Sequence, residues 1–466
     1  MSATATTEKK YLKWYQKLAY GSGDLASNCS YGLVSSFVLL YLTGTLGLDS
    51  AIIGSLMLAS KVLDGISDVI FGTLIDRTHS KLGKARPWML FGQVGVSLCL
   101  FLLFAIPAGS TTMQYIYFFI VYTALNAVFY TANGIAYSSL VALITKNNNE
   151  RVQLGSFRFM FAVVTNIFMG FAVTGMVEKF GSGAAGWRTT ALIFAIVGLV
   201  VNTISCLAVK ELPEEELSGN TSEAAEEGKA VAEEKKHGFA ETAKILVHNK
   251  YYLMILAIYI VYYIMSNLTT GAGVFCATYY WGDGSLLGQF SMMKMFPVII
   301  ALAIAPVLIK KTGSMQKVNF WGYAISSVLG IPMIYFAMQK NLSMFLLFMF
   351  IKGIFAGTLS GSLNALIAEA SGYTTRTTGV HMDGMMYSCS SLGVKVGGGI
   401  GTAAVGWLLK LGGFVGTATV QSESAIRMIF NLYITFPFVI GIIITVLLAF
   451  LDVEKANKKW DAEHQK

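Results

Sequence analysis

Charged residues are scarce in this chain. Only 13% of its 466 residues are Asp, Glu, Lys or Arg, whereas 55% are hydrophobic. A soluble domain of this length cannot bury so much apolar surface in one core, so the composition excludes an ordinary soluble protein and indicates a membrane protein. One crossing of the bilayer takes roughly 20 apolar residues, so the length allows about twelve crossings joined by short loops.

Cysteine and histidine are also rare, with five of each. The cysteines lie singly inside hydrophobic stretches without metal-ligand spacing, and we interpret them as small packing residues. They are Cys29, Cys99, Cys206, Cys276 and Cys389. The histidines are scattered over loops, linker and tail, and the sequence has neither a Gly-x-Ser-x-Gly turn nor a Gly-x-x-x-x-Gly-Lys-Ser/Thr phosphate loop. The sequence therefore predicts neither an enzyme nor a bound cofactor.

The hydrophobic stretches predict an all-α protein of twelve transmembrane helices in two bundles of six. The predicted spans are residues 20–46, 50–74, 88–107, 112–144, 155–180, 186–208, 250–281, 285–310, 315–338, 341–370, 378–411 and 422–452. These predictions divide the chain into a first bundle (1–209), a glutamate-rich linker (210–249), a second bundle (250–452) and a tail (453–466). Two bundles joined by one long polar loop are typical of the major facilitator superfamily, whose halves rock around a midplane site.

The net charge of +8 is spread over short loops instead of one basic surface, so it does not indicate a nucleic-acid partner. One set of alternate loops contains Arg77, Lys81, Lys84, Arg86, Lys146, Arg151, Lys310, Lys311, Lys317 and Arg376. The opposite set contains only Lys179, Arg188, Lys340, Lys410 and Arg427. The positive-inside rule therefore predicts a multi-pass protein of the inner (cytoplasmic) membrane with both termini and the linker in the cytoplasm.

Three charged residues lie inside the second predicted span. Lys61, Asp64 and Asp68 are spaced i, i+3 and i+7, so they share one helical face. A charge at bilayer depth costs roughly 3 kcal/mol on insertion scales and marks a wet interior or a partner. Two carboxylates beside one ammonium suit a single monovalent cation, either Na⁺, Li⁺ or a shared proton. The alternative is a packing salt bridge between the lysine and one aspartate.

Further polar residues lie in other spans. Asp24 and Asn28 form an i, i+4 pair in the first span. A group of polar residues lies together on the inner part of the fourth span. This group consists of Tyr130, Thr131, Asn133 and Ser138. Charged residues in later spans are Arg158, Lys294, Lys352, Glu369 and Lys395. Of these, Arg158, Lys294 and Glu369 are compatible with an interfacial position, where long side chains reach water, whereas Lys395 lies deep in its span.

Residues 61–88, KVLDGISDVIFGTLIDRTHSKLGKARPW, resemble the second span and following loop of the glycoside-pentoside-hexuronide:cation symporters. The similarity extends to GSGDLASN (21–28), ERVQLGSFR (150–158), TGVHMDG (378–384) and YSCSSLGVK (387–395), and so covers nearly the whole chain. It implies a monomeric secondary symporter that imports a small sugar or glycoside with a monovalent cation by alternating access. A transporter of lipids or other amphipathic solutes on the same fold is the alternative.

The resemblance also implies roles for single residues. The cation ligands would be Asp64 and Asp68, with Thr131, Ser67 and Lys61 in support. The solute would contact Asp24, Asn28, Tyr130, Asn133, Ser138, Arg158, Ser391 and Lys395. Cytoplasmic gating contacts would come from Asp76, Arg77, Lys84, Arg151 and Arg376.

The family's sugar-binding acids are partly missing, since Asn28 and Gly134 stand at two of their positions and Ser138 replaces a pocket tryptophan. Fewer acids beside Arg158, Lys395 and Lys61 favour a carboxylate-bearing solute.

Overall fold

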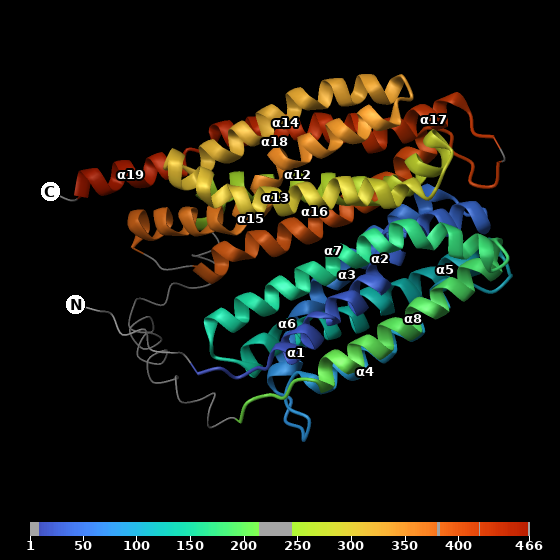
Figure 1. The fold of residues 1–466 in the computed structure, drawn as a ribbon, viewed down its shortest axis with the longest axis horizontal. Coiled ribbons are helices and arrows are strands. Elements are labelled where there is room, and N and C mark those ends of the chain that lie inside the picture. The colour runs from blue at the N-terminus through green and yellow to red at the C-terminus, as the bar shows by residue number, and fades with distance from the viewer. Residues whose placement is uncertain (1–8, 214–244, 380–382, 419, 465–466) are drawn as a thin grey trace. The chain divides into compact units, whose positions relative to one another are not determined.

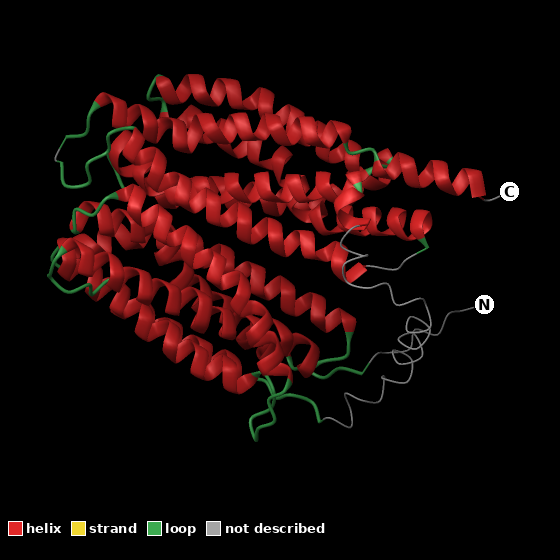
Figure 2. Cartoon of the chain, turned by 180° about the vertical axis from the view of Figure 1, so that it is seen from behind, coloured by secondary structure: helices red, strands yellow, loops and turns green. Residues whose placement is uncertain are grey.

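The computed structural model describes residues 9–213, 245–379, 383–418 and 420–464. All regular secondary structure in these ranges is helical (Figure 2). The chain divides into two compact units, Met1–Ser222 with Val415–Ala418, and Glu223–Phe414 with Thr419–Lys466. Most of the predicted linker, residues 214–244, lies outside the described residues.

Long helices run alongside one another within the first unit (Figure 1). They are α1 (Trp14–Gly21), α2 (Gly23–Leu40), η1 (Tyr41–Thr45), α3 (Ser50–Asp76), α4 (Arg86–Leu103), α5 (Thr111–Thr123), η2 (Ala124–Tyr130), α6 (Thr131–Ile144), α7 (Asn148–Lys179) and α8 (Gly183–Leu207). The η segments are wider π-helical turns that continue the adjoining helices.

The second unit is built in the same way. Its helices are α12 (Lys250–Phe275), η3 (Cys276–Trp281), α13 (Leu286–Thr312), α14 (Met315–Met338), α15 (Leu342–Thr378), α16 (Asp383–Leu411), α17 (Glu423–Phe430), η4 (Asn431–Thr435), α18 (Phe436–Phe450) and α19 (Val453–His464). The predicted tail thus contains a helix, α19, whose Asn457 donates a 2.8 Å hydrogen bond to the Glu369 carboxylate of α15.

Eleven helices in the described part of the chain are long and apolar enough to cross a membrane. The helix α3 is not among these eleven, although its 27 residues suffice for a crossing. It is the helix that carries Lys61, Asp64 and Asp68. The bounds of the long helices agree with the predicted spans to within a few residues at most ends, and all five cysteines are buried and unpaired as expected.

Side-chain caps fix where several helices begin. The carboxamide oxygens of Asn147, Asn249 and Asn341 accept hydrogen bonds from the first free backbone N–H groups of α7, α12 and α15. These groups have no partner inside the helix, so a short polar side chain at this position stops the helix from starting earlier. The starts of these three helices are therefore specified by local sequence.

Candidate cation and solute site

The charged residues of α3 line a cavity in the first unit. The cavity has a volume of about 510 Å³ and lies between α3 and the fourth span, which consists of α5, η2 and α6. Its lining residues are Lys61, Asp64, Asp68, Asn126, Tyr130, Thr131, Gly134, Ile135, Ser138 and Ser139. The i, i+3, i+7 spacing thus places the lysine and both aspartates on the face that the sequence predicted.

Asp64 lies at the centre of this group. Its Oδ1 accepts a 2.6 Å hydrogen bond from the Thr131 hydroxyl, and its Oδ2 lies 3.6 Å from the Lys61 Nζ. The two charged side chains are 19% and 14% exposed, so water has access to a pair that is mostly enclosed by protein. The expected bridge between Lys61 and Asp64 is therefore present, and it lies inside a cavity that Asp68 also lines.

The π-helical turn η2 positions the threonine. The Thr131 hydroxyl lies 2.9 Å from the Asn126 carbonyl oxygen, five residues earlier, and the wide turn leaves this oxygen outside the regular α-helical pattern. Such turns inside α-helices are frequent at functional sites. Here the turn brings a carbonyl, a hydroxyl and a carboxylate together, and these are the hard oxygen ligands that Na⁺ and Li⁺ prefer.

Ser67 takes no part in this oxygen cluster. Its hydroxyl donates a 2.9 Å hydrogen bond to the backbone carbonyl of Asp64 in its own helix, and the residue does not line the cavity. The implied role of Ser67 as a direct cation ligand is therefore not supported. Its spacing from Asp64 places it three residues further along the helix, where a serine hydroxyl readily bonds back to the preceding turn.

A second polar network lies between α2 and α7. The Arg158 Nε donates a 2.6 Å hydrogen bond to the Asp24 Oδ2, and the guanidinium lies 4.2 Å from the centre of the Tyr137 ring. The Asn28 amide donates to the Asp24 carbonyl at 2.7 Å, and its oxygen accepts from Asn166 at 2.9 Å. Arg158 is thus held by a carboxylate of α2, which favours a role in the network over a side chain that extends freely to water.

Two stacked tyrosines lie between the cavity with Lys61 and Asp64 and the polar network of α2 and α7. The rings of Tyr31 and Tyr130 have their centres 5.6 Å apart, and the Lys61 Nζ lies 5.9 Å from the Tyr31 ring. Tyr31 follows Asp24 by seven residues, two turns of α2, so both point in a similar direction from that helix. Aromatic faces beside hydroxyl and carboxylate groups are suited to a sugar, which has apolar ring faces and hydroxyls.

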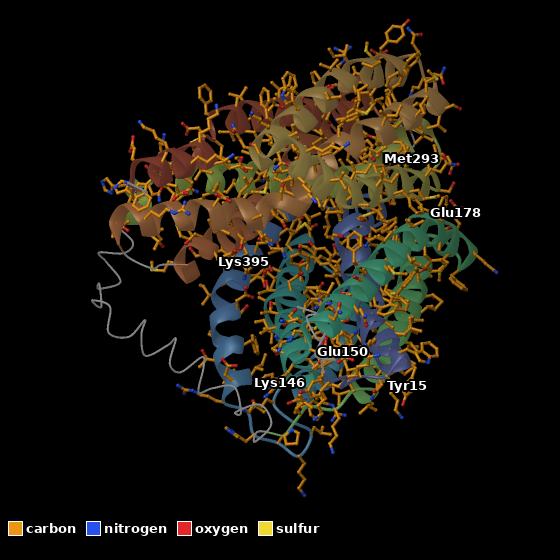
Figure 3. The ribbon with its side chains drawn as sticks, turned by 60° about the vertical axis from the view of Figure 1, so that its left-hand side comes forward. Tyr15, Lys146, Glu150, Glu178, Met293 and Lys395 are labelled. Carbon is orange, nitrogen blue, oxygen red and sulfur yellow. The ribbon has the colours of Figure 1, made fainter. Side chains whose placement is uncertain are left out.

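Asn133 lies away from the cavity. Its amide donates a 2.8 Å hydrogen bond to Gln93 of α4, and the side chain is buried where α4 packs against α6. We therefore exclude Asn133 from the candidate site, because it does not line the cavity and its amide nitrogen is bound in helix packing. Ser391 and Lys395 belong to α16 of the second unit, where Ser391 is exposed and Lys395 half-buried (Figure 3).

The implied gating residues lie at helix ends. Asp76 and Arg77 are exposed at the end of α3, and the Lys84 backbone N–H donates to Glu211 at 2.7 Å. The Arg151 Nε donates to the Thr145 carbonyl at 3.0 Å, and the Arg376 Nε lies 3.5 Å from the Asp461 Oδ1 of α19. These contacts lie within single units, and a gating role stays a prediction.

The sequence reasoning missed several residues of the two networks. Tyr31 and Asn126 were given no role, although Tyr31 lies two turns from Asp24 on the same helix face. Asn166 follows Arg158 by eight residues and so shares its face of α7, a signal that the spacing contained. Asn126 had no such signal, because its carbonyl is presented by the π-helical turn.

Comparisons with known proteins identify the family of this chain. Residues 19–455 match the family model described as "MFS/sugar transport protein". The chain is 26% identical over 459 residues to the isoprimeverose transporter of Lactiplantibacillus pentosus, covering 98% of this chain and 92% of the relative. It is 24% identical over 408 residues to the glucuronide carrier protein homolog of Escherichia coli (strain K12), covering 87% and 85%.

The fold is similar to that of solved transporters. The crystal structure of a D-xylose-proton symporter superimposes with a TM-score of 0.65 at 12% identity, over 95% of this chain and 98% of that one. At this identity the similarity concerns the fold alone, and it agrees with the expected helical architecture. Because the family model matches nearly the whole chain, this protein is a member of the MFS/sugar transport family of the major facilitator superfamily.

Proposed function

We propose that this protein is a secondary symporter that carries a sugar or glycoside across a membrane together with a monovalent cation. The observation that carries the proposal is the cavity of the first unit. Asp64 and Asp68 line it from α3, a helix of transmembrane length, and Thr131 of α6 donates a hydrogen bond to Asp64. Charged groups at such a depth are retained for function. The two relatives, an isoprimeverose transporter and a glucuronide carrier homolog, support a sugar-type solute.

The cation acts by balancing charge in the cavity. Two aspartates and Lys61 give the lining a formal charge of −1, so one bound monovalent cation makes it neutral. A neutral cavity is less costly to close off from water than a charged one, and closure is the step that alternating access requires. Cation and solute then raise each other's affinity equally, by about 5- to 150-fold for a coupling of ~1 to 3 kcal/mol.

The charge pattern of the first unit does not require an acidic solute. The sequence analysis favoured a carboxylate because of Arg158, Lys61 and Lys395, but Arg158 is bound to Asp24 and Lys61 to Asp64. Two of these three cations are therefore balanced by protein carboxylates. We propose a neutral sugar or glycoside at Asp24, Asn28, Tyr130 and Ser138, whose oxygens and ring suit hydroxyl-rich ligands.

Transport in reconstituted vesicles tests the proposal. Counterflow with a panel of glycosides, pentosides and uronides, repeated with Na⁺, Li⁺ and a pH gradient, identifies both the solute and the cation. We expect at least one sugar-type solute to accumulate when one cation gradient is imposed and not when that gradient is absent. Equal accumulation with and without every cation gradient would refute symport, while the fold would still permit uniport.

We further propose that the protein functions as a monomer in the inner membrane, with both termini in the cytoplasm. The loop charges support this orientation, because the loop between α3 and α4 is rich in Lys and Arg. Cysteines introduced at Lys81 and Lys179 test it. A membrane-impermeant thiol reagent applied to intact cells should label the second site and not the first, in a background without the native cysteines.

A further inference from the structure

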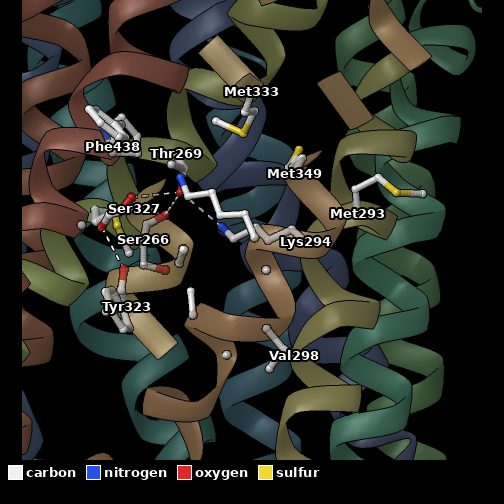
Figure 4. Close-up of a pocket in the computed structure, with 18 of the residues that line it drawn as sticks. Ser266, Thr269, Met293, Lys294, Val298, Tyr323, Ser327, Met333, Met349 and Phe438 are labelled. Atoms are coloured by element: carbon white, nitrogen blue, oxygen red, sulfur yellow. Dashed lines mark hydrogen bonds between the residues drawn. The ribbon is translucent and has the colours of Figure 1, made fainter. Parts of the chain in front are cut away.

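The second unit contains a cavity of its own, separate from the site described above. It has a volume of about 190 Å³, room for about six water molecules at ~30 Å³ each. It lies among α12, α13, α14, α15 and α18, and much of its lining is Met, aromatic and aliphatic (Figure 4). Two lysines also line it, Lys294 from α13 and Lys352 from α15. Neither has a role in the proposed cation site.

Among the described residues, neutral groups alone bind the first of these lysines. The Lys294 Nζ donates to the Thr269 hydroxyl at 3.3 Å (Figure 4) and to the Thr270 hydroxyl at 3.2 Å. Both threonine hydroxyls in turn lie 2.8 to 2.9 Å from the Ser266 carbonyl oxygen, to which they donate. The ammonium therefore has hydrogen-bond acceptors but no counter-charge in this arrangement. The sequence left open whether Lys294 lies at an interfacial helix end, and the structure shows that its side chain lines a cavity inside the unit.

The second lysine, Lys352, has fewer polar contacts than Lys294. In the described part of the chain, Lys352 forms neither a hydrogen bond nor an ion pair, and no Asp or Glu belongs to the residues that line this cavity. Hydroxyl groups line the cavity as well, including those of Ser266, Tyr323 and Ser327. The cavity thus offers two ammonium groups and several hydroxyls, with no protein carboxylate among them.

Close helix packing places the two lysines at the same depth. A methyl group added to Gly353 would lie only 2.8 Å from Pro297 Cβ, so α15 and α13 approach closely one residue after Lys352 and three residues after Lys294. The helices run in the same direction, since α14 returns between them. Counted from their first residues at ~1.5 Å per residue, Lys294 is about 12 Å and Lys352 about 15 Å into the helix.

Two like charges in one mostly apolar cavity repel each other and lack the hydration that each would have in water. A bound anion would remove both penalties at once, and the surrounding hydroxyls could donate to it or rotate toward it. We propose that this cavity is an anion-binding site, in which a carboxylate or a small oxyanion such as phosphate binds between Lys294 and Lys352. The source of the group is either a free anion or the carboxylate of an acidic solute, and the second source would replace the neutral solute proposed above.

Binding by the purified protein in nanodiscs of zwitterionic lipid tests this site without any transport. Thermal unfolding and isothermal titration calorimetry are measured with sodium phosphate, acetate and glucuronate at constant Na⁺ and ionic strength. The bulky HEPES anion serves as the reference that does not fit, and glucose as the uncharged partner of glucuronate. We expect saturable binding of at least one of the three anions with a raised unfolding temperature, and none for HEPES.

Lys294→Gln and Lys352→Gln should each weaken this binding by at least about tenfold, because each removes a charge-assisted hydrogen bond. The exposed Lys317→Gln is the matched control and should bind as the native protein does. Lys352→Arg keeps the positive charge, so its affinity for the anion should stay within about tenfold of the native value. This variant still tests the role of the charge if a glutamine variant fails to fold. Without anion, the Lys294→Gln/Lys352→Gln protein should unfold at the same or a higher temperature.

Binding of phosphate or acetate identifies a free anion as the source. Binding of glucuronate alone, without phosphate, acetate or glucose, identifies a solute carboxylate. The absence of saturable binding by all three anions, or unchanged binding in both glutamine variants, would overturn the proposal. Because no step depends on transport, these outcomes are independent of whether symport is demonstrated.

Discussion

Asp64→Asn is the sharpest perturbation of the proposed cation site. The substitution keeps the size of the side chain but removes one negative charge from a cavity that contains Asp68 and Lys61. The formal charge of the lining rises from −1 to 0, so the cavity loses its net attraction for a cation. The amide can still accept the Thr131 hydrogen bond, which is 2.6 Å long in the native protein, so local packing should survive.

The size of the effect follows from the bonds that are lost. A hydrogen bond or ligand contact to a charged group contributes roughly 1.5 to 3 kcal/mol, which corresponds to about 10- to 150-fold in binding. Lys61 also loses the counter-charge that lies 3.6 Å from its Nζ, but its side chain is 19% exposed and water replaces part of that interaction. We therefore expect cation affinity to fall by at least about tenfold, and the effect on folding to be smaller.

Uptake into proteoliposomes measures this change directly. Accumulation driven by a cation gradient should be lost in Asp64→Asn, and the cation concentration that gives half-maximal stimulation should rise at least about tenfold wherever it remains measurable. Asp452→Asn is the control and should leave uptake unchanged, because this half-exposed aspartate lies between α18 and α19, outside the cavity. Native cation stimulation in Asp64→Asn, at normal membrane abundance, would refute the reasoning.

Three further predictions concern other contacts. Arg158→Lys should reduce the initial rate of solute uptake about tenfold or more at unchanged abundance, because a lysine cannot reproduce the 2.6 Å Nε contact with Asp24 and the stacked guanidinium together; a rate within twofold of native would contradict this. Glu150→Gln should destabilise the protein by about 1 to 3 kcal/mol, seen as a lower unfolding temperature in detergent, since this buried carboxylate accepts two backbone N–H groups, a hydroxyl and the Lys17 ammonium (Figure 3). Gly357→Leu should destabilise the protein by about 1 to 3 kcal/mol, because even a methyl group there would lie 2.7 Å from a side chain of α13. Gly372→Ala in the same helix is the control, since its methyl group meets no neighbour within 4 Å. Equal unfolding temperatures of these two variants would argue against tight α13–α15 packing.

The helices were predictable from the sequence because each is specified locally. Twenty or more apolar residues between polar loops define a crossing, and caps such as Asn249 and Asn341 fix the first residue of a helix. The face of α3 that carries Lys61 and Asp64 also followed from spacing alone, since a helix has a fixed period. These features depend on residues that are close in sequence.

The contacts between helices were not predictable in the same way. Asn133 and Ser138 share one helix in sequence, yet Asn133 bonds to Gln93 while Ser138 lines the cavity. The π-helical turn η2 adds to this, because it rotates the residues after it relative to a regular α-helix. The position of Lys294 was left open for a related reason, since its surroundings depend on how α13 packs against α15.

The two units share a supporting device but differ in the charges of their cavities. Glu211, from the segment after α8, accepts three backbone N–H groups at the start of α4, and Glu454, at the start of α19 after α18, accepts two at the start of α14. In each case a carboxylate binds the positive end of the third long helix of its own unit. A contact that recurs at corresponding positions belongs to the common scaffold, as expected of a fold built from repeated halves.

The cavities do not follow this repetition, because the first contains two aspartates and the second two lysines without an acid in its lining. Charged residues that break the correspondence are not explained by the shared packing, and they are therefore where the ligand specificity of each unit should be sought.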